Sequence, residues 1–341
     1  MLRVALIGCG GIAAAHVSGY AALPAQTARV TVVCDADRAA AEALATRAGA
    51  THVDDDWAAT VARADIDAID ICLPHDLHAA VAIAAAERGK HVIVEKPLAT
   101  TLADADAMIA AAERSGVVLM CALCERYHPE YERIKEIVDS GVLGDPVLAR
   151  IDHNQDVEMP PGHWIRQAER IGGGAVASAG CHRLDLLRWY FGEVADVSSF
   201  GYRDSGRMEG EVAGVVNLRF ANGAIGTLTI NWMSRRRPWY ESIWLEGARG
   251  SVHNHGGVHV HSLDVPEWSD DYVRLDVPAA NAFAEELRHF AHCIDSGATP
   301  LTDGHEARRT MAVALAAYES ERSGRTVDPR LLLDSSGESD A

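Results

Sequence analysis

Lys96 stands where a strand and a ligand site would meet. It follows the apolar residues 92–94 and Glu95, and Pro97 comes next. A run of β-branched residues is typical of a buried parallel strand, and proline ends it because it cannot donate to the strand ladder. Ligands of open α/β sheets bind beyond the carboxyl ends of the strands. We therefore expect the Lys96 amine to face a ligand, although lysines at strand ends are more commonly solvated.

A second stretch, which begins at Gly172, reads as a helix that a glycine run opens. Ser178, His182 and Asp185 follow one another at spacings of four and three, so that they share one helix face. Histidine is the side chain best suited to move protons near neutral pH, and a serine or a carboxylate on the same face can orient it. The alternative is a surface histidine with an incidental hydrogen bond.

The elements that would position these side chains begin at the N-terminus. A strand over residues 3–7 runs into Gly8-x-Gly10-x-x-Ala13 and then into an alanine-rich helix. Gly8 allows the tight turn, Gly10 lets the backbone approach a pyrophosphate, and Ala13 keeps the helix close to the strand. The helix N-terminus favours the phosphates. The expected contacts of this loop with a dinucleotide are Gly8, Gly10, Gly11, Ile12 and Ala13.

A carboxylate follows the second strand. Residues 29–34 end in Asp35, at about the distance of 20 residues at which dinucleotide folds place the acid that binds the ribose. That acid accepts bonds from the ribose hydroxyls and repels a 2′-phosphate, so Asp35 favours NAD over NADP. Arg38 is close enough to weaken this preference, and we count both among the cofactor-binding residues.

Strands and helices alternate through the first third of the chain. Strands are predicted at 3–7, 29–34, 67–72, 91–95 and 117–121, and helices near 12–22, 37–48, 56–63, 76–88 and 101–115. This alternation predicts a parallel, doubly wound sheet.

The rest of the chain contains a run of short strands. After a helix at 131–140 and a strand at 147–153, strands are predicted at 195–202, 211–220, 224–232, 239–246, 249–254, 258–263 and 271–277, with helices at 279–296 and 303–322.

The fold class predicted is therefore α/β, with an N-terminal Rossmann doubly wound parallel sheet and a C-terminal α+β domain. The second domain holds a large, mostly antiparallel open sheet. We place the dinucleotide-binding domain at residues 1–122 and the substrate-binding and oligomerisation domain at 123–330, whose last helices can pack back on the first domain. Residues 331–341 are predicted to be a disordered acidic tail.

Composition excludes several classes of protein. The chain of 341 residues has a formal net charge of −18, which argues against nucleic acid as a partner. No apolar stretch is long enough for a membrane span, and the N-terminus carries no signal-peptide pattern. Seven scattered cysteines indicate reduced thiols in the cytoplasm. Cys121 and Cys124 have the spacing of a redox pair, but packing explains a cysteine within a predicted strand better.

Together, three motifs resemble the glucose–fructose oxidoreductase, inositol dehydrogenase and rhizopine catabolism (Gfo/Idh/MocA) family, over about residues 1–325. They are the glycine loop, Glu95-Lys96-Pro97 and the glycine-opened helix with His182 and Asp185. Similar supporting segments are Leu73-Pro74-His75-Asp76-Leu77-His78, Arg126-Tyr127-His128-Pro129 and Ser140-Gly141-Val142-Leu143-Gly144-Asp145-Pro146.

The resemblance implies an NAD(H)-dependent enzyme that oxidises a secondary alcohol of a sugar, sugar derivative or cyclitol, or reduces the ketone. Lys96 would contact the reacting oxygen and the nicotinamide ribose, and His182 would be the base in oxidation and the acid in reduction. Asp185 would bind a substrate hydroxyl or orient His182. The resemblance also implies a homodimer or homotetramer assembled through the C-terminal sheet.

Further site residues follow by analogy. Trp164, in the long connection 154–171, could stack on a sugar face. Arg126, Tyr127 and Ser178 complete the expected substrate contacts. The remaining expected cofactor contacts are Leu73, Pro74, His75, His78, Glu95 and Lys96.

Ser178 departs from the family pattern, because many members have an aspartate there. A hydroxyl can orient His182 but holds no negative charge beside an imidazolium, so we expect a lower pKa for His182 than in a relative with the aspartate. The departure leaves open a non-redox member of the family, such as an epimerase or a glycoside-cleaving enzyme that retains NAD. A non-catalytic binding protein on this fold is the less favoured alternative.

Two other clusters are given less weight. His253, His255, His259 and His261 would gather on one face only if a three-residue turn paired 255 with 259, whereas a two-residue turn would pair 255 with 258. We favour exposed histidines over a zinc site, and we predict no metal. The basic run 235–237 could bind an anionic substrate group, but a solvated connection is the more common arrangement.

Overall fold

The computed structural model describes residues 1–235 and 239–335, which form two compact units. The first comprises residues 1–127 and 280–308, and the second comprises residues 128–279 and the chain from 309 onward. The first boundary lies at Tyr127, whereas the sequence placed it at 122, and residues 280–308 belong to the first unit. Among the described residues, no helix combines the length and the apolar character that a membrane crossing requires.

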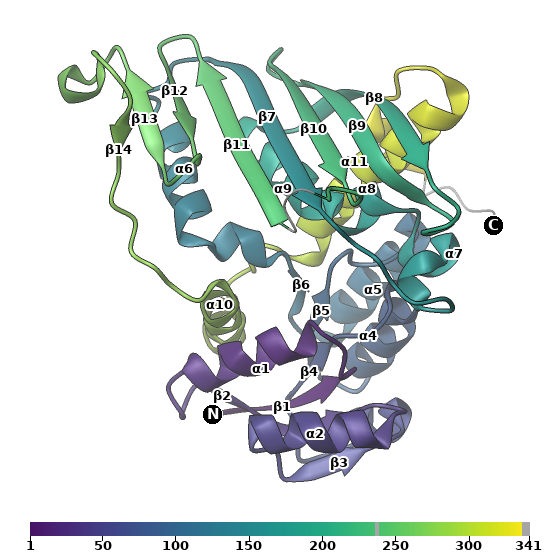
Figure 1. Ribbon diagram of the computed structural model, residues 1–341. Coiled ribbons are helices and arrows are strands. Elements are labelled where there is room, and N and C mark those ends of the chain that lie inside the picture. The colour runs from purple at the N-terminus through teal and green to yellow at the C-terminus, as the bar shows by residue number, and fades with distance from the viewer. Residues whose placement is uncertain (236–238, 336–341) are drawn as a thin grey trace. The chain divides into compact units, whose positions relative to one another are not determined.

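The first unit holds a six-stranded parallel sheet in the order β3-β2-β1-β4-β5-β6 (Figure 1). The strands are β1 (Leu2–Ile7), β2 (Ala28–Cys34), β3 (His52–Asp54), β4 (Ala68–Ile71), β5 (His91–Glu95) and β6 (Leu119–Ala122). The doubly wound parallel sheet is confirmed. The prediction lacked β3, because its three residues are too few to show a hydrophobic pattern.

Four of the helices in this unit begin at a capping side chain. The helices are α1 (Ala13–Ala22), α2 (Arg38–Ala48), α3 (Trp57–Val61), α4 (His78–Ala86), α5 (Leu102–Ser115) and α10 (Ala282–Ser296), with short 3₁₀ turns η1 (His75–Leu77) and η2 (Cys124–Tyr127). The side chains of Asp37, Asp56, Thr101 and Asn281 accept backbone N–H bonds at four of the helix starts.

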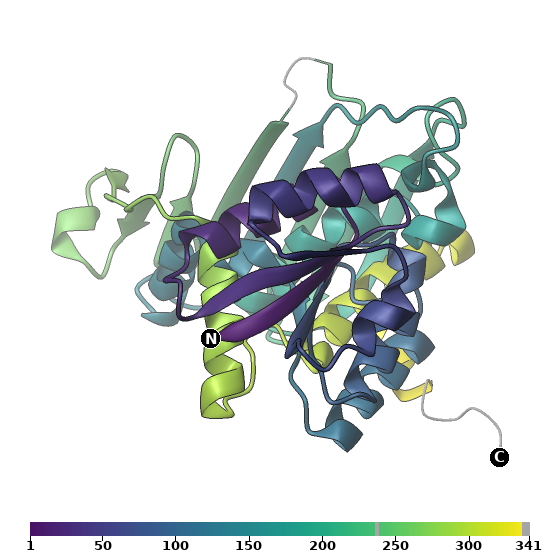
Figure 2. The ribbon, with the colours of Figure 1, turned by 90° about the horizontal axis from the view of Figure 1, so that it is seen from below.

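Helix α10 comes from the far end of the chain and packs against α1 (Figures 1 and 2). The backbones approach so closely that a Cβ built on Gly19 would lie 2.9 Å from the Leu287 side chain and 3.0 Å from Phe283. Glycine at position 19 therefore makes this close packing feasible.

The second unit holds an eight-stranded sheet in the order β14-β13-β12-β11-β7-β10-β9-β8. Every neighbouring pair is antiparallel except β7 and β10, which are parallel. The strands are β7 (Pro146–Gln155), β8 (Val194–Arg203), β9 (Glu211–Phe220), β10 (Ile225–Asn231), β11 (Trp239–Gly247), β12 (Gly250–His253), β13 (His259–Ser262) and β14 (Val273–Arg274). The mostly antiparallel sheet is confirmed, although the last strand is shorter than predicted.

Helices of the second unit contact one face of this sheet. They are α6 (Pro129–Asp139), α7 (Ala168–Ile171), α8 (Ala175–Ser178), α9 (Gly180–Phe191), α11 (Gly304–Ser323, whose first residues belong to the first unit) and α12 (Pro329–Ser335), with 3₁₀ turns η3 (Trp164–Arg166) and η4 (Pro266–Trp268). Side chains alternate along the strands, so that β9 buries Val216 and Leu218 while Val215 is 39% exposed. The opposite face presents Phe200, Tyr202, Val215 and Ile225 to solvent.

Three sequence-based expectations need correction or comment. The predicted disordered tail begins too early, because α12 continues to Ser335; residues 336–341 lie outside the described part of the chain. Of the basic run, Arg235 is exposed and lies 3.5 Å from Asp156 and 3.6 Å from Glu158, whereas Arg236 and Arg237 lie outside the described residues.

The histidine hairpin adopts neither register that we considered. His253 lies opposite His259 with their rings stacked at 4.8 Å, and His255 lies in the turn. Trp244 stacks on the other side of His253 at 4.1 Å. In the described chain this hairpin does not bring three metal-ligating atoms together. The expected exposure is wrong for His253, which is 8% exposed because it packs in this aromatic stack, whereas His255 in the turn is exposed.

Candidate active site

The glycine loop between β1 and α1 has the shape that a dinucleotide requires. Gly8 has a φ of +98°, and a Cβ there would lie 2.4 Å from the carbonyl oxygen of Cys72. Only glycine is therefore tolerated at position 8. No heavy atom lies within 4 Å of where a Cβ would stand on Gly10 or Gly11, which leaves the backbone accessible. Ile12 precedes the first turn of α1, and Ala13 is fully buried.

Asp35 lies just beyond β2 and fixes the same loop. One of its carboxylate oxygens accepts the backbone N–H of Cys9 at 2.7 Å, and the other accepts that of Asp37 at 2.8 Å. Arg38 opens α2 on the surface and pairs with Glu42 at 3.0 Å. The carboxylate predicted to bind ribose therefore also shapes the glycine turn, while Arg38 has an acidic partner of its own.

The segment after β4 is tied to the segment after β5 through His78. This imidazole is fully buried, and its two nitrogens lie 2.9 Å from the carbonyl oxygen of Pro97 and 3.0 Å from that of Leu73. Burial lowers the pKa of His78. Pro74 and His75 lead into α4 through η1, and His75 is also buried. The expected cofactor contacts after β4 thus belong to one ordered connection.

Lys96 directly follows β5, as the sequence predicted. In the parallel sheet, β4 lies between β1 and β5. The glycine loop follows β1 and Lys96 follows β5, so both lie at the carboxyl edge of the sheet. Glu95 is buried, and one of its oxygens accepts the backbone N–H of Lys96 at 3.1 Å. Cys121 lies in β6 and Cys124 in η2, and the two thiols form no disulfide with each other.

In the second unit, the predicted polar stripe lies on two consecutive helical segments. Ser178 ends α8, and His182 and Asp185 lie in α9, with only Ala179 between the segments. All three side chains are buried, Ser178 being 7% and His182 8% exposed. The Oδ1 atom of Asp185 accepts the hydroxyl of Thr310 at 3.0 Å, so Asp185 is part of the internal structure of the unit.

The start of this helical region is held by two residues that the sequence did not point to. The Tyr318 hydroxyl accepts the backbone N–H groups of Gly174 at 2.9 Å and Ala177 at 3.0 Å, and it donates to Glu211 at 2.9 Å. Glu211 also accepts the N–H of Val176 at 2.8 Å. These bonds satisfy helix N–H groups that would otherwise have no partner. Burial raises the pKa of both Glu211 and Tyr318.

A further buried ion cluster anchors α9 to the sheet. The Arg183 guanidinium, 1% exposed, pairs with Glu241, which also accepts from Tyr131 and from His153 at 3.0 Å. Burial alone would raise the pKa of Glu241, but the charge of Arg183 and the hydrogen bonds from His153 and Tyr131 together outweigh it, and the pKa is lowered. Sequence reasoning missed this cluster, because its members come from four separate elements.

The other predicted substrate contacts lie in different settings. Arg126 is buried and pairs with Glu306 at 3.2 Å, and the Tyr127 hydroxyl lies 3.5 Å from that of Thr302. These polar groups bond within the first unit. Trp164 lies in η3 and packs against the core of the second unit.

The fold and its glycine loop define an NAD-binding oxidoreductase of the Rossmann class. Residues 2–123 match the model of the oxidoreductase family with an NAD-binding Rossmann fold, and residues 131–253 match the C-terminal domain model of the GFO/IDH/MocA family. The chain belongs to the GFO/IDH/MocA family of oxidoreductases. The predicted family, enzyme class and NAD cofactor are thereby confirmed.

Similar proteins include dehydrogenases of different sugars and cyclitols. The D-apiose dehydrogenase of Paraburkholderia graminis is 28% identical, over 96% of this chain and 90% of that protein. The NAD-dependent scyllo-inositol 2-dehydrogenase of Bacillus subtilis is 29% identical, over 96% of each chain. A solved levoglucosan dehydrogenase, in complex with NADH and levoglucosan, superposes with a TM-score of 0.88 at 26% identity, over 96% of this chain and 99% of that one.

Proposed function

We propose that this enzyme transfers hydride between NAD and a secondary alcohol or ketone on a polyhydroxylated ring. The observation that carries the proposal is the position of Lys96 at the carboxyl edge of the NAD-binding sheet. The neighbouring strand β4 leads into the Leu73–His78 connection, which holds further expected cofactor contacts. Oxidised NAD supplies the hydride acceptor when it is bound. The residues of this chain then have to stabilise the reacting oxygen and take its proton.

Lys96 and His182 have the chemistry for these two tasks. The Lys96 ammonium stabilises the alkoxide-like oxygen that develops as the hydride leaves. A neutral His182 imidazole accepts the hydroxyl proton in oxidation and returns it in reduction. The burial of His182, at 8% exposed, limits competition from bulk water.

The supporting residues divide according to their contacts. We assign Ser178 and Trp164 to the substrate side, with Ser178 one helical turn before His182. Asp185 is held by Thr310, so we assign it to positioning the helix, in place of direct contact with substrate. Arg126 and Tyr127 have internal partners in the first unit and are assigned the same supporting task there.

The substrate class proposed is a sugar, an anhydrosugar or a cyclitol, since the similar proteins include dehydrogenases of D-apiose, scyllo-inositol and levoglucosan. NAD is preferred to NADP because the Asp35 carboxylate lies at the end of β2, where it would repel a 2′-phosphate. Arg38 is already paired with Glu42, which reduces its capacity to bind that phosphate.

The experiment is a fluorescence screen for NADH formation with D-apiose, levoglucosan, scyllo-inositol and myo-inositol, with NAD and NADP in parallel. We expect turnover of at least one compound with NAD, and its loss by about 10²-fold or more in Lys96→Met and in His182→Asn. Wild-type kcat in either variant would refute the assigned roles. NAD retained through purification, without net NADH formation from a substrate that is consumed, would identify the non-redox alternative.

We also propose that a second copy of this chain covers the open face of the eight-stranded sheet. Phe200 is 71%, Tyr202 63% and Ile225 48% exposed on that face, which is unusual for large apolar side chains that share one surface. Ile225→Glu should shift the mass in multi-angle light scattering towards the monomer, whereas Leu331→Glu, on the exposed surface of α12, should not. An unchanged mass in Ile225→Glu would refute the proposal.

The seven cysteines all carry reduced thiols, which supports the cytoplasm as the compartment.

A further inference from the structure

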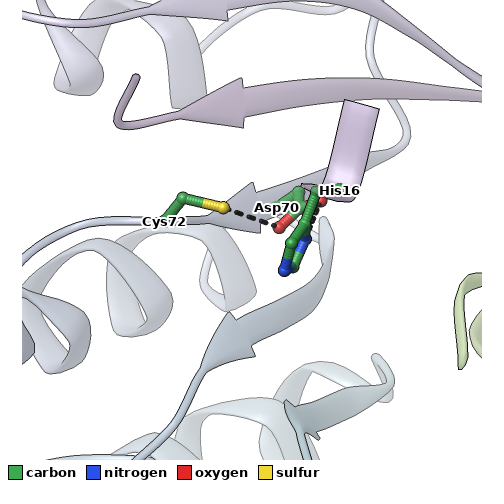
Figure 3. A group of neighbouring side chains, drawn as sticks. All are labelled: His16, Asp70 and Cys72. Carbon is green, nitrogen blue, oxygen red and sulfur yellow. Dashed lines mark hydrogen bonds and ion pairs between the residues drawn. The ribbon is translucent and has the colours of Figure 1, made fainter. Parts of the chain in front are cut away.

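A fully buried histidine of the first unit bridges two carboxylates. His16 lies in α1, and its Nδ1 atom is 2.9 Å from Oδ2 of Asp70 in β4. Its Nε2 atom is 3.1 Å from Oε1 of Glu95 in β5. His16 and Asp70 are both 0% exposed, and Glu95 is 6% exposed. Figure 3 shows the ring of His16 directed at Asp70, with Cys72 on the other side of that carboxylate.

The two contacts require two protons on the ring. An ionised carboxylate only accepts hydrogen bonds, and a neutral imidazole carries a single N–H. An imidazolium donates to both Asp70 and Glu95, whereas a neutral ring would leave one buried acceptor without a donor. Burial opposes a charge on His16, but Asp70, through its charge and its hydrogen bond, acts together with Cys72 to outweigh burial, and the pKa of His16 is raised well above its ordinary value. In turn, the hydrogen bond and charge of His16 outweigh burial and lower the pKa of Glu95.

Lys96 and His78 lie near Glu95 and also lower its pKa, and the other titratable groups around the bridge are buried. Burial raises the pKa values of Tyr20, Cys72, Cys124 and Glu286, which approach from α1, the end of β4, η2 and α10. Glu286 is 0% exposed, and within the described residues neither of its oxygens has a hydrogen-bond partner. A protonated Glu286 avoids a third buried negative charge. The bridge therefore consists of one cation and two anions.

A metal ion is the alternative occupant of this place. His16, Asp70 and Cys72 offer three ligand atoms within 4.8 Å of one another. However, the donor atoms of the three side chains are already engaged in hydrogen bonds. The Cys72 thiol lies 3.6 Å from Asp70 and donates to it, and His16 already uses both nitrogens. Protons explain the cluster with the contacts that are present.

The bridge ends on the backbone of Lys96. Glu95 accepts from His16 with one oxygen and from the N–H of Lys96 with the other, at 3.1 Å. We propose that His16 is a positioning residue, whose doubly protonated ring holds the Glu95 carboxylate and through it the backbone from which the Lys96 amine projects. This inference rests on the proposed function, in which Lys96 stabilises the reacting oxygen. His16 acts only through Lys96 and touches neither substrate nor cofactor.

A double-mutant cycle tests this dependence on Lys96, with the panel compound that the wild type oxidises fastest. His16→Gln retains one donor and loses the charge, so we expect kcat to fall by about 10- to 100-fold with a smaller change in KM. In the Lys96→Met background the same substitution should change kcat by less than about twofold, because the group that it positions is absent. The matched control is His91→Gln at the opposite end of β5, where the ring accepts the N–H of Val118 and contacts neither Glu95 nor Lys96, and its kcat should equal that of the wild type.

The outcomes separate the two proposals. If Lys96→Met alone leaves kcat unchanged, the proposed function fails. If Lys96→Met is impaired and His16→Gln lowers kcat equally in both backgrounds, or lowers only thermal stability, the positioning inference is overturned.

A measurement on the wild type remains decisive if His16→Gln does not fold. In protein labelled with ¹⁵N-histidine, both ring nitrogens of His16 should still carry protons near pH 7, where an ordinary histidine is mostly neutral. A single protonated nitrogen near pH 7 would overturn the inference.

The raised pKa also makes the stability of the fold depend on pH. The contribution of His16 to the free energy of unfolding is full below about pH 6.5 and is lost as the pH rises through the pKa of His16 in the folded state.

Discussion

Replacing Tyr318 with phenylalanine should weaken the start of the helical region that carries His182. The hydroxyl makes three hydrogen bonds, to the N–H groups of Gly174 and Ala177 and to Glu211, at 2.9–3.0 Å. At about 0.5–1.5 kcal/mol net per bond, their loss reduces the free energy of unfolding by about 2–4 kcal/mol. A domain of about 150–250 residues loses about 2–4 °C in Tm per kcal/mol, so we expect a decrease of about 4–16 °C.

Hydrogen exchange of the wild type and the variant locates the effect. Exchange at Gly174 and Ala177 should be at least about 30-fold faster in Tyr318→Phe, since each 1.4 kcal/mol corresponds to about tenfold in an equilibrium constant. The control Ser205→Ala removes a hydroxyl from an exposed side chain in the turn after β8, and should change neither Tm nor exchange at these amides. Unchanged exchange at Gly174 and Ala177, with or without a fall in Tm, would refute the view that Tyr318 holds this turn.

Three more substitutions test the site. Gly8→Ala should abolish NADH binding in a fluorescence titration, because the new Cβ would lie 2.4 Å from the carbonyl oxygen of Cys72 at a φ of +98°. Ser178→Asp should move the pH–rate profile for oxidation to higher pH, because a carboxylate one turn before His182 favours the protonated imidazole, whereas the uncharged Ser178→Asn should not. Asp35→Asn keeps an oxygen for the N–H of Cys9 and removes the charge, so the preference for NAD over NADP in kcat/KM should decrease; an unchanged ratio would remove Asp35 from cofactor discrimination.

Local signals explain what the sequence could predict. The strand, the glycine turn and the helix that follows it occupy one short segment, and each property depends on neighbours along the chain, such as the positive φ of Gly8. The strand end at Lys96 is recognisable for the same reason, because Pro97 stops the ladder. The helix with His182 was predicted from spacing alone, and the structure adds a junction at Ala179 between α8 and α9.

Contacts between distant residues explain what the sequence could not predict. His16 is separated by 54 residues from Asp70 and by 79 from Glu95, and 107 residues separate Glu211 from Tyr318. No periodicity specifies which of the many acidic residues will meet a given histidine or tyrosine. His16 does follow Ala13 at a spacing of three, which places it on the helix face that packs on the sheet. A histidine on such a buried face was the one available signal that a polar partner had to lie beneath it.

A buried carboxyl group binds a backbone N–H at or shortly before each residue assigned to the chemistry. Glu95 binds the N–H of Lys96, and Glu211 binds that of Val176, six residues before His182. The two carboxyl groups differ in whether they have to be ionised. Glu211 accepts the N–H of Val176 and the hydroxyl of Tyr318 with a single oxygen. An amide oxygen could accept the same two bonds, so the charge of Glu211 is dispensable there, in keeping with the upward shift of its pKa. Glu95 instead accepts from the His16 ring, and the ionised Glu95 stabilises the second proton of that ring together with Asp70. The helix start in the second unit therefore depends on hydrogen-bond geometry, whereas the backbone of Lys96 depends on a buried charge pair and so on pH.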